Sequence, residues 1–433
     1  MRSIWYDGIK MEKFQPQNGD MKTDVLIIGG GLCGILCAYM LRNEGVDCTV
    51  VEAGRICSGI TGCTTAKITF QHGLIYDEII SKYGLESAEM YYKSQKNALE
   101  KYKELTQSID CDFENCSSVV YSLTDRAVIE KEISALEKIG CKSEFITETE
   151  LPFEVLGAVK IESQAKFHPL KFISEIAKDI KIYENTKVTE LKPREVITDK
   201  GKIIAKKIIV TTHFPFINKH GLYFVKMYQP RSYVTAIKGA PDIRDMYVDE
   251  AQNGLSFRSH NGILLLGGGG HRTGEDGQGW NAPQKACQRY YPDAEIVQKW
   301  ATQDCITLDS IPYIGQYSKA TPDFYVATGF NKLGMTSSMV SATILTDMIC
   351  DRENEYASLY SPSRSVLHPQ LFVNVLKSAK GLLTPTAPRC PHLGCALKYN
   401  KQEHSWDCSC HGSRFDENGK LLDNPATDDL QEN

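Results

Sequence analysis

The chain has 433 residues, of which 42% are apolar, and a formal net charge of −5 with a sequence pI near 6.1. This length is sufficient for two or three domains with sizeable cores, and the weakly acidic balance without blocks of like charge excludes a basic nucleic-acid-binding surface. The first 20 residues lack a signal-peptide pattern and the 15 cysteines are an odd number, so we expect a reducing, cytoplasmic location.

Residues 22–52 predict a strand, a glycine turn, a helix and a second strand. The stretch 25–41 is almost continuously apolar, which would also suit a membrane span. Its central glycines, with Asp24 and Arg42 at the flanks, indicate instead a buried strand followed by a turn and a buried helix. We therefore expect no membrane span.

The glycine turn has the spacing GxGxxG, with Gly29, Gly31 and Gly34 between strand and helix. Gly29 permits the tight turn, Gly31 lets the backbone approach a pyrophosphate, and Gly34 lets the helix pack closely on the strand. Glu52 ends the next strand, where a carboxylate binds ribose hydroxyls. The alternative is a glycine turn that arose by chance, but such a turn would not require a strand before it, a helix after it and an acid at the end of the next strand. We therefore predict a dinucleotide site. This motif by itself suits either FAD or NAD.

The rest of the chain before the tail alternates between helical and β-rich patterns. In chain order, the patterns predict helices over 75–108, 125–139 and 169–180, a small sheet from 181–191, 195–198 and 202–211, short β-rich runs over 222–270, a helix near 295–304, a strand over 324–327 and a helix through residue 349. Two histidines in this region, His168 and His213, are interpreted as structural.

Cysteines and histidines cluster in the tail, as Cys-Pro-His-Leu-Gly-Cys at 390–395 and Cys-Ser-Cys-His-Gly-Ser at 408–413. Zinc could take two Cys and two His, four Cys could form two disulfides, and a Cys–His pair could be catalytic. However, zinc fingers rarely use Cys–x–His, disulfides leave the histidines unexplained, and no oxyanion or substrate motif accompanies the pair.

The tail resembles closely the Rieske pattern CxHxGC…CxCHGS. The resemblance implies a [2Fe–2S] cluster in which Cys390 and Cys408 hold one iron while His392 and His411 hold the other. Two neutral imidazoles leave the cluster less negative than four thiolates would, which raises its potential into the range of about −150 to +300 mV.

The two remaining cysteines, Cys395 and Cys410, match residues that form a disulfide between the cluster loops in the high-potential class of this family. A reducing cytoplasm opposes a disulfide, but a bridge shielded by the loops can persist. The residues before Cys390 match few Rieske strands, so we expect an abbreviated module that leans on the rest of the chain, with Pro425 near the cluster.

Three segments, 52–61, 309–315 and 329–336, resemble the FAD-dependent D-amino acid oxidase / glycine oxidase superfamily, and the resemblance spans roughly residues 22–350. It implies FAD rather than NAD, and no second GxGxxG indicates a nicotinamide site. A helix beginning near 335–338 would point N–H groups at the negative charge of a reduced flavin. The FAD residues expected are Gly29, Gly31, Gly34, Glu52, Arg55, Ser58, Gly59, Thr61, Val188, Gly329, Gly334, Met335 and Thr336.

These patterns together predict an α/β fold: a Rossmann-like FAD-binding domain, a β-rich substrate domain of α+β type, and a small C-terminal all-β Rieske-type module. The expected boundaries are an N-terminal arm (1–20), the FAD-binding domain (21–220 and 306–355, with a helical insertion at about 75–165), the substrate domain (221–305), a linker (356–381) and the Rieske module (382–433).

A flavin combined with a Rieske cluster implies an oxidoreductase, because FAD accepts two electrons from a substrate and the cluster carries one. We expect oxidation of a small amine or amino-acid-like molecule at FAD, with electrons exchanged singly with an external carrier. Two alternatives stay open: a non-enzymatic flavin/iron–sulfur electron carrier or redox sensor, and an oxygen-reducing oxidase.

Substrate-binding candidates lie in the β-rich middle of the chain, where this superfamily builds its substrate cavity. They are Arg231, Tyr233, Arg258, His271 and Arg272. An arginine among them could clamp a carboxylate with two hydrogen bonds. For any single one of the five, a role as a surface or packing residue is the favoured interpretation.

Overall fold

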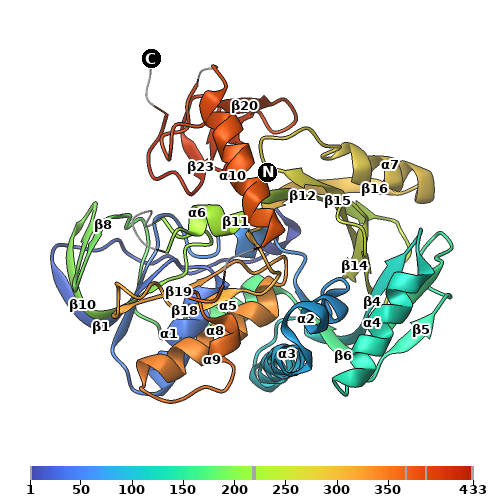
Figure 1. The fold of residues 1–433 in the computed structure, drawn as a ribbon, viewed down its shortest axis with the longest axis horizontal. Coiled ribbons are helices and arrows are strands. Elements are labelled where there is room, and N and C mark those ends of the chain that lie inside the picture. Colours follow the sequence, from blue (N-terminus) through green and yellow to red (C-terminus); the bar gives the residue numbers. More distant parts are fainter. Residues whose placement is uncertain (1, 217–220, 366–367, 386–387, 431–433) are drawn as a thin grey trace.

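The computed structural model describes residues 2–216, 221–365, 368–385 and 388–430 (Figure 1). Two large sheets make up the body, and a small four-stranded sheet at the C-terminal end lies at one side of it (Figure 1). The short pair β11 (Met227–Tyr228) and β17 (Ile306–Thr307) stands apart from both large sheets.

The first sheet has the order β18–β19–β10–β1–β2–β7, and β9 and β8 extend it from β10. β7, β2, β1, β10 and β19 are parallel, as expected for strands that are apolar on both faces. The bounds are β1 Met21–Ile28, β2 Cys48–Val51, β7 Ile182–Tyr183, β8 Val188–Lys192, β9 Glu195–Thr198, β10 Gly201–Val210, β18 Tyr313–Gln316 and β19 Phe324–Thr328.

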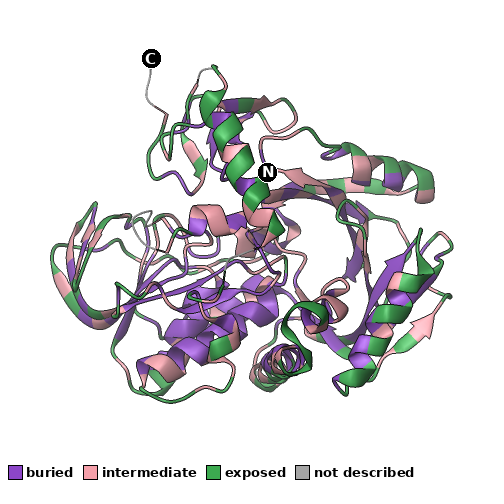
Figure 2. Cartoon of the chain, viewed as in Figure 1, coloured by how far each residue is buried: buried purple, intermediate pink, exposed green. Residues whose placement is uncertain are grey.

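Buried helices cover this sheet (Figure 2). α1 (Leu32–Asn43) packs against α8 (Gly334–Ile349), and both are almost entirely buried. Small side chains on both helices permit this close approach. The other helices of the body are α2 (Ile75–Tyr83), α3 (Leu85–Thr106), α4 (Arg126–Lys138), α5 (Pro169–Ile176), α6 (Tyr223–Lys226) and α7 (Asn281–Tyr290).

The second sheet has the order β16–β12–β15–β14–β13–β4–β6–β3, with β5 attached to β6. Its pairs are antiparallel except for β13 with β4. The bounds are β3 Lys67–Ile68, β4 Glu114–Ser122, β5 Glu144–Ile146, β6 Gly157–Lys166, β12 Pro230–Lys238, β13 Met246–Asp249, β14 Ser256–His260, β15 Ile263–Arg272 and β16 Glu295–Gln303.

Two expectations for this region are wrong. Residues 295–304 form strand β16 rather than a helix, because they pair along β12 and their exposure alternates with period 2. The segment 75–165 is not a purely helical insertion, since it contributes β4, β5 and β6 to the second sheet. The buried residues Val119–Tyr121 belong to β4, which pairs with β6 and with β13. Of these two strands, β6 is the nearer in sequence.

The segment 356–381, expected to be a linker, contains α9 (Ala357–Tyr360) and most of α10 (Pro369–Leu383). Pro369 occupies the first turn of α10, and His368 Nδ1 accepts a hydrogen bond from the Gln370 N–H, so the helix begins with a standard cap. The four strands that follow are β20 (Leu397–Asn400), β21 (Ser405–Cys408), β22 (Arg414–Asp416) and β23 (Leu421–Asp423).

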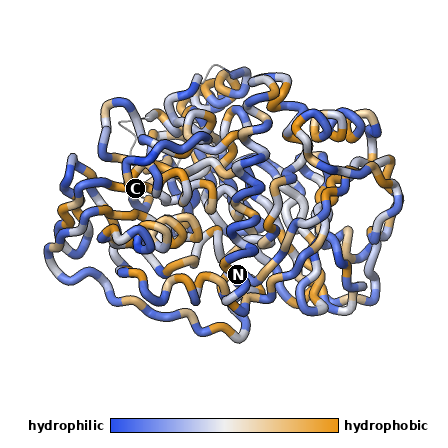
Figure 3. Tube along the Cα trace, turned by 90° about the horizontal axis from the view of Figure 1, so that it is seen from below, coloured by the Kyte–Doolittle hydropathy of each residue, from blue (hydrophilic) through white to orange (hydrophobic). Residues whose placement is uncertain are grey.

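The N-terminal residues run along the body and include a short 3-10 helix, Ile4–Tyr6. Hydrophobic stretches along the chain are short and are interrupted by hydrophilic residues (Figure 3). Within the described ranges, no helix is long and apolar enough to cross a membrane.

Candidate functional site

A cavity of about 1310 Å³ runs between the two large sheets and reaches the C-terminal module. One end lies at the glycine turn after β1, and another part is bounded by β12 and β15 of the second sheet. Residues 421–424 of the module form part of the wall. The cavity is therefore a single space bordered by all three parts of the chain.

The glycine turn has the geometry that its spacing predicts. Gly29 has φ of +111°, and a side chain there would lie 2.8 Å from the Thr211 carbonyl oxygen. A Cβ at Gly34 would overlap the Gly29 carbonyl, so this glycine permits close packing of α1 on β1. Gly31 faces the cavity, where a Cβ would meet only Thr61 Oγ1, at 3.3 Å. This open cradle before a helix N-terminus fits a pyrophosphate.

Glu52 lines the cavity at the end of β2 and accepts hydrogen bonds from the Gly30 and Gly54 N–H groups, each 2.8 Å long. Burial raises the pKa of its carboxyl, while the two N–H donors oppose this. Arg55 also lines the cavity and forms an ion pair of 2.7 Å with the buried Glu184. These two side chains fit an FAD bound with its ribose at Glu52 and its phosphates at the turn.

Most of the expected FAD residues border this cavity, namely Gly29, Gly31, Glu52, Arg55, Ser58, Gly59, Thr61, Val188, Gly334 and Met335. Three do not. Gly34 packs α1 on β1, Gly329 lies against Thr307, and the Thr336 hydroxyl is fully buried and donates to the Thr69 carbonyl. α8 begins at Gly334, so its N-terminal turn lies at the cavity as predicted.

Two of the substrate candidates are structural. The fully buried Arg258 donates to the carbonyls of Thr65, Ala66 and Phe167. Arg231 forms a bidentate ion pair with Glu403 of the C-terminal module. Neither lines the cavity. Their guanidinium groups are occupied by chain partners that lie far away in sequence, so neither can clamp a substrate carboxylate.

The other three candidates, Tyr233, His271 and Arg272, do line the cavity. The Tyr233 hydroxyl is 2.9 Å from His271 Nε2 and donates to Glu403 at 2.8 Å. Arg272 donates to the carbonyls of Ser409 and Cys410, at 3.2 and 3.0 Å. Tyr233 and Arg272 therefore hold the C-terminal module against the body, where substrate binding had been expected.

Three cavity residues were not predicted to be functional: Lys67, His72 and His213. Burial and the nearby Arg258 guanidinium lower the pKa of Lys67 to about 7, and its Nζ donates to the Tyr247 carbonyl at 3.0 Å. In the sequence, Lys67 is the single Lys, Arg, Asp or Glu between Arg55 and Asp77, a signal that could have found it.

The two histidines are half-buried at the cavity wall. Burial lowers the pKa of His72 to about 3 and also lowers that of His213. Within the described part of the chain, His213 Nε2 has no hydrogen-bond partner. Its interpretation as purely structural is not supported by this position at the cavity wall.

The predicted cluster ligands come together in the C-terminal module. The His392 and His411 ring centroids are 5.0 Å apart, and the Cys390 and Cys408 thiols share a hydrogen bond. That hydrogen bond lowers the pKa of Cys390 to about 7 and raises the pKa of Cys408. Burial lowers the pKa of both imidazoles, to about 4 and about 3, so they are neutral, as metal ligands must be.

The donor set fits an iron–sulfur cluster. His411 is buried, and its Nδ1 has no hydrogen-bond partner among the described residues, whereas its Nε2 lies 3.2 Å from Ser378 Oγ. A buried, unsatisfied imidazole nitrogen beside thiols fits a metal ligand. Thiolates at Cys390 and Cys408 would accept backbone N–H bonds from residues of their own loops.

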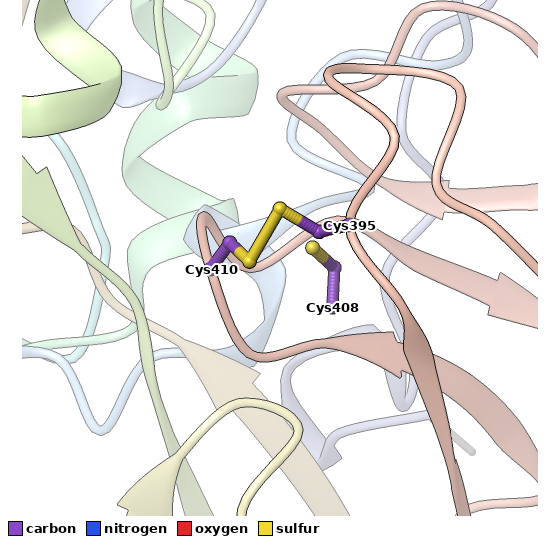
Figure 4. A group of neighbouring side chains, drawn as sticks. All are labelled: Cys395, Cys408 and Cys410. Atoms are coloured by element: carbon purple, nitrogen blue, oxygen red, sulfur yellow. A yellow bond between two sulfur atoms is a disulfide. The ribbon is translucent and has the colours of Figure 1, made fainter. Parts of the chain in front are cut away.

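Cys395 and Cys410 form a disulfide with a Cα–Cα distance of 6.6 Å. The Cys408 sulfur lies next to this bridge, within 4.8 Å of both of its sulfur atoms (Figure 4). α10 packs on the other side, where a Cβ at Gly381 would overlap Cys410 Sγ. The bridge thus ties the two cluster loops together under the helix.

Comparisons with known families agree with both sites. The family of FAD dependent oxidoreductases, DAO, matches residues 24–348, and the Rieske [2Fe-2S] domain matches residues 358–432. The second match includes α10, so this domain begins earlier than the expected boundary at residue 382.

Among curated relatives, YhfW of Bacillus subtilis, described as a Rieske 2Fe-2S iron–sulfur protein, is 32% identical over 99% of this chain and 97% of its own. The γ-glutamylputrescine oxidoreductase of Escherichia coli is 24% identical over 81% of this chain and 89% of its own.

Solved structures share the fold of the body. L-proline dehydrogenase from P. horikoshii superposes with a TM-score of 0.67 at 19% identity, covering 81% of this chain and 98% of that one. Glycine oxidase from Geobacillus kaustophilus superposes with a TM-score of 0.65 at 17% identity, covering 79% and 99%. The chain therefore belongs to the DAO family of FAD-dependent oxidoreductases and carries a C-terminal Rieske [2Fe–2S] domain.

Proposed function

We propose that this enzyme oxidises a small amine or amino-acid-like molecule in the large cavity and passes the electrons, one at a time, through its Rieske cluster to an external carrier. The observation that carries the proposal is the position of Arg272, which borders the cavity and donates to the carbonyls of Ser409 and Cys410 in a cluster loop. One side chain thus connects the wall of the cavity with a cluster loop.

When bound, FAD supplies a two-electron acceptor for a C–H bond, and the cluster supplies a one-electron carrier. Glu52 and the glycine turn would hold FAD, and α8 would direct N–H groups at its ring. Cys390, His392, Cys408 and His411 would hold the cluster. The protein's own task is to keep these two groups at a fixed separation.

Buried amide side chains support that task. Gln229 Nε2 donates to the carbonyls of His411 and Asn424, at 2.8 and 3.0 Å. Gln303 Nε2 donates to the Gly412 carbonyl and to Gln229 Oε1, each at 2.9 Å. Because both amides belong to the body, the cluster loop is docked directly on it, and electron transfer within one chain requires no movement of the module.

On the substrate side, Lys67 is the residue best suited to handle a proton. It is half-buried at the cavity wall without a carboxylate contact in the described structure, and its pKa of about 7 lets it accept a proton from a substrate ammonium group. Amine oxidation needs this proton removed before a hydride can leave the adjacent carbon. The relative that acts on γ-glutamylputrescine supports an amine substrate.

A cavity of this volume favours turnover over the alternative of a non-enzymatic carrier or sensor. The test uses holoprotein and its Cys390→Ser variant under anaerobic conditions, with the flavin reduced by light and EDTA. We expect the wild type to develop the EPR signal of a reduced Rieske cluster as the fully reduced flavin gives up one of its two electrons, whereas the variant should keep its flavin fully reduced. Cys287→Ser, a buried thiol remote from both sites, is the control.

Oxidation of the fully reduced flavin in Cys390→Ser at the wild-type rate would refute transfer through the cluster. Steady turnover with oxygen that does not depend on Cys390 would instead support a conventional oxidase.

A further inference from the structure

Helix α10 carries its apolar side chains on the outside. Phe372 is 65% exposed, Leu376 69% and Leu383 82%, while the polar Asn374 is 2% exposed. The helix shows this exposed face along its length in Figure 2. Amphipathic helices of folded proteins normally turn the apolar face inward, and contiguous apolar patches of more than a few hundred Å² are uncommon on monomers unless something binds there.

The inner face of α10 explains this inversion, because it packs on the cluster loops. Asn374 Oδ1 accepts a hydrogen bond from Arg272, at 3.0 Å, and Ser378 Oγ lies 3.2 Å from His411 Nε2. Gly381 lies against the disulfide. These polar and small residues are spaced by four and three, on one side of the helix, so the apolar residues are forced to the opposite side.

The exposed face continues onto the cluster loop itself. Leu382 is 50% exposed and Leu393 41% exposed, and Leu393 directly follows the predicted ligand His392. Arg389 joins the two segments by donating to the carbonyls of Leu382 and Gly394, at 3.2 and 2.9 Å. We call the exposed apolar surface of Phe372, Val375, Leu376, Leu382, Leu383 and Leu393 the α10 patch.

The patch is separated from the cluster site by the thickness of one helix, about 10 Å. The opposite side of the cluster loops is closed by the body: Gln229 and Gln303 bind the backbone of residues 411–412, and the Phe224 ring lies 5.5 Å from the His411 ring. An electron that leaves the protein from the cluster thus has its short path on the side of α10 and of the partly exposed residues 391–393.

The segment that carries the patch is basic in sequence, although the whole chain has a net charge of −5. Residues 369–402 contain five Lys or Arg and no Asp or Glu, namely Lys377, Lys380, Arg389, Lys398 and Lys401. Lys377 and Lys398 form ion pairs with residues 275 and 276, whereas Lys380 is exposed and contacts no carboxylate within the described structure. An apolar centre with a basic rim fits a partner that has an apolar centre and an acidic rim.

We propose that the α10 patch is the docking site for a small acidic one-electron carrier protein, which exchanges electrons with the cluster across α10. The proposal rests on the proposed function in that the cluster must exchange electrons outside the chain. A membrane surface or a second copy of this chain could also cover an apolar face, but neither accounts for the position of the patch directly over the cluster.

The test measures electron transfer by stopped flow from a chemically reduced, acidic plant-type [2Fe–2S] ferredoxin to the oxidised cluster of the holoprotein. The patch variant is Phe372→Ser/Leu376→Ser, and its matched control is Leu85→Ser/Val297→Ser, which changes two exposed apolar residues elsewhere. The charge variant is Lys380→Glu, with Lys319→Glu as its control. Unchanged cluster absorbance and potential verify that each variant keeps an intact cluster.

We expect the second-order rate to fall roughly tenfold or more in the patch variant and in Lys380→Glu, and to stay unchanged in both controls. The wild-type rate should decrease steeply with added salt.

Equal ferredoxin rates in all variants would overturn the proposal, as would a wild-type rate that does not change with added salt. Two other outcomes, each with unchanged ferredoxin rates, would also overturn it. If the patch variant loses self-association, the patch is a dimer interface. If the variant loses binding to phosphatidylglycerol vesicles, the patch is a membrane-binding surface. If ferredoxin transfer depends on the patch while the flavin never reduces the cluster, the docking site stands and the proposed function fails.

Discussion

Arg231 of the second sheet and Glu403 of the Rieske domain form a bidentate ion pair in which both side chains are less than 10% exposed. Glu403 also accepts a hydrogen bond from Arg414 of its own domain at 2.9 Å, so its carboxylate links the two parts of the molecule. Both guanidinium groups hold the pKa of Glu403 below its usual range despite burial. The pair is a fixed docking contact, which explains why Arg231 is not available to a substrate.

Glu403→Gln should separate the Rieske domain from the body. The change leaves two buried guanidinium groups without their shared carboxylate, and breaking a buried pair from one side costs about 3–5 kcal/mol. Denaturant unfolding followed by cluster absorbance should show this loss, and hydrogen exchange should rise in β12 and β21. Glu417→Gln removes an exposed carboxylate from the same domain and should leave stability nearly unchanged; equal effects of both variants would contradict the docking role.

Cys395→Ser should weaken the cluster loops without removing a cluster ligand. The disulfide closes a separation of 15 residues, and a loop of that size is worth about 3 kcal/mol. The cluster absorbance should bleach at a lower temperature than in the wild type. Added thiol reductant should lower the wild-type bleaching temperature and leave the variant where it is. A reductant effect of equal size on the variant would mean that another group is being reduced.

Gly31→Ala and Gly34→Ala should fail in different ways. A methyl group at Gly31 meets only Thr61 Oγ1, at 3.3 Å, and projects into the cavity, so the variant should fold normally but bind FAD weakly. At Gly34 the methyl group collides with the Gly29 carbonyl, so both folding and FAD binding should suffer. Thermal unfolding of the FAD-free protein and a flavin fluorescence titration separate the two outcomes, and tight FAD binding by Gly31→Ala would exclude a pyrophosphate at the turn.

Lys67→Met should stabilise the protein in a pH-dependent way. Because the pKa of Lys67 is lowered from 10.5 to about 7, the unfolded chain holds a proton that the folded protein lacks between these two values. The wild type therefore loses stability as pH falls from about 10.5 to about 7, by up to about 5 kcal/mol from this group. The variant avoids this loss, so its advantage in free energy of unfolding should be greatest below pH 7 and vanish above 10.5. The exposed Lys319→Met is the control, and a pH-independent difference would show that Lys67 stays charged.

The sequence predicted the two cofactors because each motif is confined to a short stretch of the chain. The glycine turn and Glu52 are separated by one strand and one helix, and the Rieske ligands occupy two short loops. Local geometry requires particular residue types at fixed spacing, so a motif carries the site. Other expectations differed from the structure. Residues 295–303 form a strand and not a helix because they pair with β12, which is distant in sequence. The segment 356–381, expected to be a linker, contains most of α10, whose start is capped by His368.

The sequence alone therefore determined which two cofactors the protein binds. The glycine turn of the first domain and the three segments that resemble the oxidase superfamily indicated FAD, and the Rieske motif of the tail indicated the [2Fe–2S] cluster. Tertiary structure alone decided how the two sites are joined. It assigned Arg231, Tyr233 and Arg272 to the docking of the Rieske domain, because their partners lie more than 130 residues away and no spacing rule connects them. The tertiary structure also showed that α10 turns its apolar face outward. This orientation depends on which side of the helix the cluster loops occupy, and the sequence of the helix does not specify that side.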